Sequence, residues 1–139
     1  MYIDTSALVP LYALEADSAR CEAIVSTGDG LFSSELVIGE MTGTLLAKER
    51  AGLIPPALRA EIQLKFDEHV ASGVVRLISL KGMTVHEGAE IMHRVHPLAL
   101  RTLDALHLAT CLSVEAGPLF TRDHRMRAAA VKLGIPLAD

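Results

Sequence analysis

The sequence predicts an α/β fold with a mainly parallel sheet that is covered by helices on both faces. Short apolar runs of β-forming residues alternate along the chain with longer segments rich in Ala, Leu, Glu and Arg. This alternation is typical of parallel sheets whose strands are joined by helical crossovers. Glycines and prolines separate the segments, and 139 residues can form one core, so we expect a single domain over residues 1–139.

Five short runs fit strands, and six longer segments fit helices. The strands are expected at residues 1–4, 30–33, 74–80, 118–121 and 135–138. The helices are expected at residues 6–28, 35–51, 57–72, 83–95, 99–115 and 124–133. Capping residues support these limits, because Ser33 and Ser34 can begin the helix at residues 35–51, Gly52 can end it, and Gly134 can end the last helix.

Composition limits the class of protein. Half of the residues are apolar and only 4% are aromatic, so we expect an ordered chain with an aliphatic core. No apolar run reaches the roughly 18–20 residues that a membrane span requires, and residues 1–4 lack the basic start of a secretory signal. Cys21 and Cys111 belong to no metal-binding or redox motif. We therefore expect a cytoplasmic protein with two reduced core thiols and no membrane partner.

Two acidic residues follow predicted strands. Asp4 ends the run at residues 1–4, and Asp123 comes just after the run at 118–121. In parallel sheets, ligands bind outside the carboxyl ends of the strands, so both side chains should project from the same edge. Each residue also precedes a helical segment. The alternative is therefore that one or both serve only as N-caps.

Two further acids lie in predicted helices. Glu40 is four residues from Leu36 and three from Val37, so it shares their apolar face, where a carboxylate is costly unless it is paired or metal-bound. Asp104 opens a helix that is apolar nearly all round. The alternatives are a surface position for Glu40 and a helix start favoured by the dipole for Asp104. His107, one turn later, is expected to be a core residue rather than a ligand.

Together the four acids predict a metal site. Neighbouring carboxylates repel one another unless a cation compensates them, and all-oxygen ligation selects Mg²⁺, or else Mn²⁺, over Zn²⁺. Such an ion can activate water and stabilise charge on a phosphodiester. The chain has 17 acidic and 13 basic residues, which counts against binding nucleic acid by bulk electrostatics. Bound cations would offset the four carboxylates, so a nucleic-acid substrate is not excluded.

Four sequence motifs surround these acids in a characteristic order. They are Tyr-Ile-Asp-Thr-Ser-Ala-Leu, Ser-Ser-Glu-Leu-Val-Ile-Gly-Glu-Met, Leu-Asp-Ala-Leu-His-Leu-Ala-Thr and Phe-Thr-Arg-Asp-His-Arg-Met. In order and approximate spacing they resemble the PIN-domain family, and specifically the VapC-type toxins of toxin–antitoxin systems. The resemblance covers essentially the whole chain, and the motif around Asp104 is the most specific.

The resemblance implies a three-layer α/β/α sandwich with a five-stranded sheet. It implies that Asp4, Glu40, Asp104 and Asp123 are the catalytic metal ligands. It also implies supporting polar groups, namely Thr5 or Ser6, and Thr121. The implied reaction is Mg²⁺-dependent hydrolysis of RNA, leaving 5′-phosphate and 3′-hydroxyl ends. A homodimer and a cognate antitoxin are implied as well, as for a toxin that inhibits translation or growth.

Basic residues near the acids are expected to contact RNA. Arg101, Arg122 and Arg125 are close in sequence to the predicted ligands. Because the chain contains few aromatic residues, readout of bases by stacking should be limited, and the sequence does not predict the target RNA.

Other functions fit the sequence less well. A haloacid-dehalogenase-like phosphatase also uses an Asp at the end of its first strand, but it would need an acid at position 6, which is Ser. The non-enzymatic alternative is a catalytically silent PIN-like module that binds only RNA or a partner. Neither a P-loop motif nor a GxSxG motif occurs in the sequence.

Overall fold

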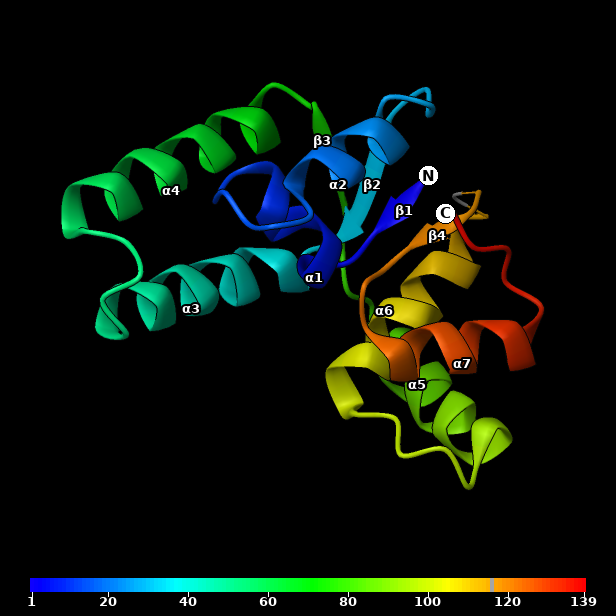
Figure 1. The fold of residues 1–139 in the computed structure, drawn as a ribbon. Helices are drawn as coiled ribbons and strands as arrows, with labels where there is room; N and C mark the ends of the chain where they lie inside the picture. The colour runs from blue at the N-terminus through cyan, green and yellow to red at the C-terminus, as the bar shows by residue number, and fades with distance from the viewer. Residues whose placement is uncertain (116) are drawn as a thin grey trace.

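A computed structural model describes residues 1–115 and 117–139 of the chain (Figure 1). Four parallel strands form its sheet, in the order β3-β2-β1-β4. Tyr2, in the central strand β1, pairs with Phe32 on one side and with Leu119 on the other. The strands are β1 (Tyr2–Ile3), β2 (Leu31–Ser34), β3 (Val75–Ile78) and β4 (Leu119–Phe120).

Helices cover both faces of the sheet, as Figure 1 shows. One face packs against α1 (Thr5–Leu8), the 3-10 helix η1 (Val9–Leu11), α2 (Ser18–Val25), α3 (Leu36–Arg50) and α4 (Pro56–Ala71). The other face packs against α5 (Gly82–Val95), α6 (Thr102–Ser113) and α7 (His124–Leu133).

Successive residues of each strand supply the two cores. Ile3 packs in the cluster that contains Leu45 of α3, whereas Tyr2 packs in the cluster that contains Leu108 of α6. All four side chains are fully buried. This alternation follows from the two-residue period of a strand, and it makes the short strands the shared wall of both cores. The predicted three-layer α/β/α architecture is therefore confirmed.

The predicted fifth strand, at residues 135–138, is reduced to a single bridge. Leu137 pairs in parallel with Leu119, whose N–H donates to the Pro136 carbonyl at 2.8 Å and whose carbonyl accepts from Ala138 at 2.9 Å. Pro136 has no N–H, so the ladder cannot continue through it. The prediction of five strands was therefore wrong by one.

The predicted helix at residues 6–28 is also divided, into α1, η1 and α2. Pro10 lies in η1, where its ring is incompatible with a continuous α-helix. Ser18 then ties the connection together, because its hydroxyl donates to the Pro10 carbonyl at 2.7 Å and accepts from the Glu15 N–H at 2.9 Å. This folded connection brings Glu15 back toward α1.

The predicted caps of α3 behave differently from one another. Ser33 is fully buried in β2 and donates to the Ile3 carbonyl at 2.6 Å, so it joins two strands instead of capping the helix. Ser34 accepts from the Leu36 N–H at 3.3 Å, close to the role that the sequence predicts.

Two expectations from composition can be compared with the structure. Cys21 and Cys111 are buried and unpaired, as predicted for core thiols. Within the described part of the chain, no helix combines the length and the apolar character that a membrane crossing requires.

Gly134 ends α7 in a left-handed conformation, with φ of 73°. A Cβ at this position would meet nothing within 4 Å, so only the backbone conformation opposes a side chain there. We predict that Gly134→Ala lowers the free energy of unfolding by about 1 kcal/mol in urea titrations. Gly39→Ala is the matched control, because Gly39 lies within α3 in open space and should gain up to about 1 kcal/mol. A loss of equal size in both variants would contradict this explanation.

Candidate functional site

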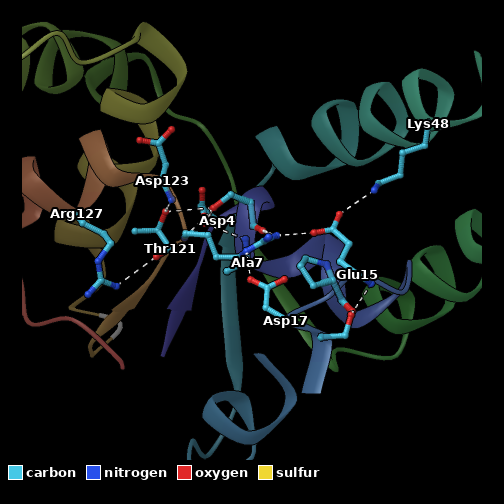
Figure 2. Close-up of polar contacts among 12 residues, drawn as sticks. Asp4, Ala7, Glu15, Asp17, Lys48, Thr121, Asp123 and Arg127 are labelled. Atoms are coloured by element: carbon cyan, nitrogen blue, oxygen red, sulfur yellow. Dashed lines mark hydrogen bonds and ion pairs between the residues drawn. The ribbon is translucent and has the colours of Figure 1, made fainter. Parts of the chain in front are cut away.

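A pocket of about 680 Å³ opens at the carboxyl ends of β1 and β4, beside α1, α3 and α6. All four acids singled out from the sequence line it, although they come from four separate segments of the chain. Figure 2 shows two of them, Asp4 and Asp123, together with Thr121 between them. The fold therefore brings the predicted residues together, while their role as ligands stays a prediction.

Asp4 is held rigidly at the start of α1. It is 4% exposed, and its Oδ1 accepts from the Ser6 hydroxyl at 2.9 Å and from the Ala7 N–H at 3.3 Å. Burial raises the pKa of Asp4 above its ordinary value, and the nearby His107 together with the hydrogen bonds from Ser6 offsets only part of this effect. The N-cap function and the position in the pocket thus belong to the same side chain.

Glu40 lines the pocket from α3, and its Oε2 accepts two hydrogen bonds. The Thr5 hydroxyl donates one, and Nε2 of His107 lies 2.9 Å away and provides the other. Burial acts to raise the pKa of Glu40, but the hydrogen bond and electrostatic interaction with His107, together with the hydrogen bond from Thr5, outweigh it, and the pKa is lowered. Glu40 is therefore a fixed, ionised group rather than a solvated surface charge.

Asp104 lies in the first turn of α6 and contains an unsatisfied atom. Among the described residues, its Oδ2 is the one buried side-chain oxygen or nitrogen with no hydrogen-bond partner. Burial, and then the negative charge of Asp123, raise the pKa of Asp104, while Arg101 acts in the opposite direction. A buried carboxylate oxygen without a donor is costly, and a cation is the kind of group that would satisfy it.

Asp123 is the N-cap of α7. Its Oδ1 accepts from the N–H groups of Arg125 at 2.7 Å and Met126 at 3.0 Å, and its Oδ2 lies 3.8 Å from the guanidinium of Arg101. The cap that the sequence left as an alternative is thus present. One oxygen serves the helix, and the other remains on the side of Arg101.

The predicted supporting hydroxyls connect these acids. Thr5 binds Glu40, and Ser6 binds Asp4 and lies 3.3 Å from the Thr121 hydroxyl. Thr121 in turn accepts from the Asp123 N–H at 3.1 Å. A continuous polar network therefore runs from Asp4 to Asp123 across the ends of β1 and β4.

The three predicted RNA-binding arginines lie in different environments. Arg122 forms ion pairs of 2.7 Å with Glu15 and with Asp17, so its charge is already used within the chain. Arg101 is 64% exposed and lines the pocket. Arg125 is exposed on α7 and is not part of the pocket wall. Of the three, Arg101 has the position and the freedom that contact with a substrate requires.

Two features of the site were not predicted from the sequence. His107 is 2% exposed, as expected for a core residue, but it also hydrogen-bonds Glu40. Its spacing of three residues from Asp104 was the available signal, because residues i and i+3 share a helix face. Glu15 forms an ion pair with Lys48, whose Nζ lies 2.8 Å from Oε1 of Glu15 (Figure 2). Glu15 also pairs with Arg122 and borders the pocket. No local pattern distinguished it within a segment that reads as one helix.

The carboxylate oxygens are suitable ligands for a divalent cation, but they do not form a complete coordination site. Within residues 1–115 and 117–139, no three acidic, His or Cys side chains are arranged closely enough to hold a metal ion as they stand. The unpaired Asp104 Oδ2 and the shared pocket nevertheless match an oxygen-ligated Mg²⁺, which typically keeps several waters and uses few protein ligands.

We predict that Asp104→Asn stabilises the metal-free protein. Because the pKa of Asp104 is raised in the folded protein, its negative charge destabilises the fold at pH values above that pKa. This destabilisation disappears at pH values below the ordinary pKa of 3.8. Because solvent reaches part of the side chain, the gain should not exceed about 1 kcal/mol, a few degrees in melting temperature at neutral pH in EDTA.

The stabilisation should shrink as the pH falls toward 3.8, because the wild-type carboxyl then becomes protonated. Asp29→Asn, at an exposed turn, is the control for a general charge effect and should leave the melting temperature unchanged. Equal stabilisation by both variants, or a gain that does not depend on pH, would rule out the explanation from burial and repulsion.

Comparisons with known proteins identify the family and agree with the fold. The family model for the PIN domain matches residues 1–132. Ribonuclease VapC46 of Mycobacterium tuberculosis is 34% identical over 97% of this chain and 93% of its own length. Ribonuclease VapC45 of the same species is 32% identical over 82% of this chain and 76% of its own length.

A solved structure shares the fold. The crystal structure of VapC20 of Mycobacterium tuberculosis, described as a sarcin–ricin loop cleaving toxin, has a TM-score of 0.71 and 18% sequence identity. The match covers 92% of this chain and 93% of that one. This chain therefore belongs to the PIN-domain family and, within it, to the VapC ribonucleases.

Proposed function

We propose that this chain is a Mg²⁺-dependent endoribonuclease that acts as the toxin of a type II toxin–antitoxin pair. The observation that carries the proposal is the pocket in which four carboxylates from separate segments meet, one of them with a buried, unpaired oxygen. The relatives named as VapC ribonucleases give the reaction class. We further propose that residues 1–139 make up a single PIN-like domain.

Asp4, Asp104, Glu40 and Asp123 would hold the metal ion. Bound there, Mg²⁺ or Mn²⁺ would lower the pKa of a water molecule and offset charge on the phosphodiester. The chain's own residues set the geometry, because Ser6 orients Asp4 and the α7 amides orient Asp123. The products would be a 5′-phosphate and a 3′-hydroxyl.

Arg101 would meet the phosphate backbone at the rim of the pocket, since it is exposed and faces Asp123. Arg122 would instead brace the site, because Glu15 and Asp17 already neutralise it. The Tyr and Phe side chains are all buried or half-buried. Binding should therefore depend on the backbone and shape of the RNA more than on stacking, and the sarcin–ricin loop, which VapC20 is described as cleaving, is one substrate to test.

The proposed partners and location follow from the proposed role as a toxin ribonuclease. We propose a cognate antitoxin that occupies the pocket, a homodimer, and a cytoplasmic location where the RNA substrate is present. The catalytically silent module named above as an alternative would keep the partners and lose the chemistry, so an activity assay separates the two.

The test is incubation of the purified protein with total RNA in Mg²⁺ and in EDTA, followed by mapping of the cut ends. We expect metal-dependent cuts with 5′-phosphates, and a loss of at least about 100-fold in rate for Asp4→Asn and for Asp104→Asn. Glu61→Gln removes one charge from the exposed face of α4, outside the pocket, and should cleave normally. Cuts that persist in EDTA, or that are equal in wild type and Asp104→Asn, would refute the proposal.

A further inference from the structure

A chain of buried hydrogen bonds lies behind the pocket and ends on Glu40. The Ser34 N–H donates to the Tyr2 hydroxyl at 3.1 Å, and this hydroxyl lies 2.8 Å from Nδ1 of His107. Nε2 of His107 lies 2.9 Å from Oε2 of Glu40. Tyr2 is fully buried and His107 is 2% exposed, so water does not compete for these contacts.

The direction of each hydrogen bond follows from what each group can donate. An ionised carboxylate only accepts, so Nε2 of His107 must carry the hydrogen that binds Glu40. In a neutral imidazole the other nitrogen then has no hydrogen and accepts, so the Tyr2 hydroxyl donates to Nδ1. The Tyr2 oxygen remains free to accept from Ser34. Every group in the chain has one consistent role.

This arrangement uses both nitrogens of His107 and so leaves none to bind a metal ion. It also links two proposed ligands from different helices. Asp104 lies one turn from His107 on α6, and His107 in turn contacts Glu40 on α3. Glu40 has a long, flexible side chain that is 24% exposed. His107 and Thr5 both bind its Oε2, and among the described residues no hydrogen bond involves Oε1, which remains available to a ligand in the pocket.

We propose that Tyr2 and His107 are positioning residues of the active site, in which Tyr2 holds His107 as the Nε2–H tautomer and His107 fixes the Glu40 carboxylate for metal binding. This inference rests on the proposed function, since it assigns Glu40 to the metal site. Removing a hydrogen bond that orients a metal ligand typically lowers metal affinity or activity by about 10–100-fold.

The first measurement is the tautomer of His107, read from nitrogen chemical shifts of the protein labelled in its histidine rings at about pH 8, where imidazole side chains are ordinarily neutral. We expect a protonated Nε2 and an unprotonated Nδ1, with the signal identified by its absence in His107→Gln. Tyr2→Phe should produce a mixture of tautomers. Tyr12→Phe is the matched control, because Tyr12 makes an equivalent 2.9 Å contact with His69 away from the pocket. A doubly protonated ring or an Nδ1–H tautomer in the wild type would overturn the proposal.

The second measurement is Mn²⁺ affinity together with kcat and KM for RNA. His107→Leu removes both hydrogen bonds and should weaken Mn²⁺ binding and lower kcat by about 10–100-fold, with KM little changed. His107→Gln should recover most of the loss, because its amide can still donate to Glu40. Tyr2→Phe, which keeps the ring in the core, tests the same point if His107→Leu does not fold.

The two proposals fail in different ways. If the wild type does not cleave RNA, the proposed function fails, whereas the tautomer and the Mn²⁺ affinities still decide the role of His107. If the wild type cleaves RNA and the Tyr2 and His107 variants match it in Mn²⁺ affinity and kcat, the positioning role is refuted and the nuclease assignment stands.

Discussion

The site depends on one constraint: four carboxylates line a single pocket, where burial, and for Asp104 also repulsion from Asp123, opposes their ionisation. Burial raises the pKa of Asp4, and burial together with the charge of Asp123 raises that of Asp104. Glu40 shows the opposite direction, because hydrogen bonds from His107 and Thr5 stabilise its charge. The chain therefore keeps acids that do not favour folding, as expected where function rather than stability selects the residues.

The parallel sheet makes this concentration of charge possible. Asp4 and Asp123 follow adjacent strands that end at one edge, and each also caps the helix that begins there. At a helix N-cap, a carboxylate accepts hydrogen bonds from backbone N–H groups of the first turn. These N–H groups have no partner within the helix, so no other hydrogen bond is lost. The two roles that the sequence left as alternatives, cap and pocket residue, are compatible. In both residues Oδ1 serves as the helix cap, while the side chain lines the pocket.

Much of the fold was predictable because local signals and tertiary structure agree. The four observed strands and the last five helices lie within a few residues of the predicted limits. The helix predicted over residues 6–28 was wrong because Pro10 divides it, and the fifth strand was reduced because Pro136 lacks an N–H. For the site, periodicity placed Glu40 on the correct face. The contact of His107 with Tyr2, from the opposite end of the chain, depends on tertiary packing that no local pattern encodes.

The proposed chemistry requires the pocket to bind a divalent cation through these carboxylates. Crystals of the wild-type protein grown with Mn²⁺ in place of Mg²⁺, measured for anomalous scattering, test it most directly. We expect a strong peak in the pocket, with oxygens of Asp4 and Asp104 at about 2.0–2.3 Å and Glu40 coordinating directly or through water. A peak elsewhere on the protein, or Mn²⁺ held by none of the four acids, would contradict it.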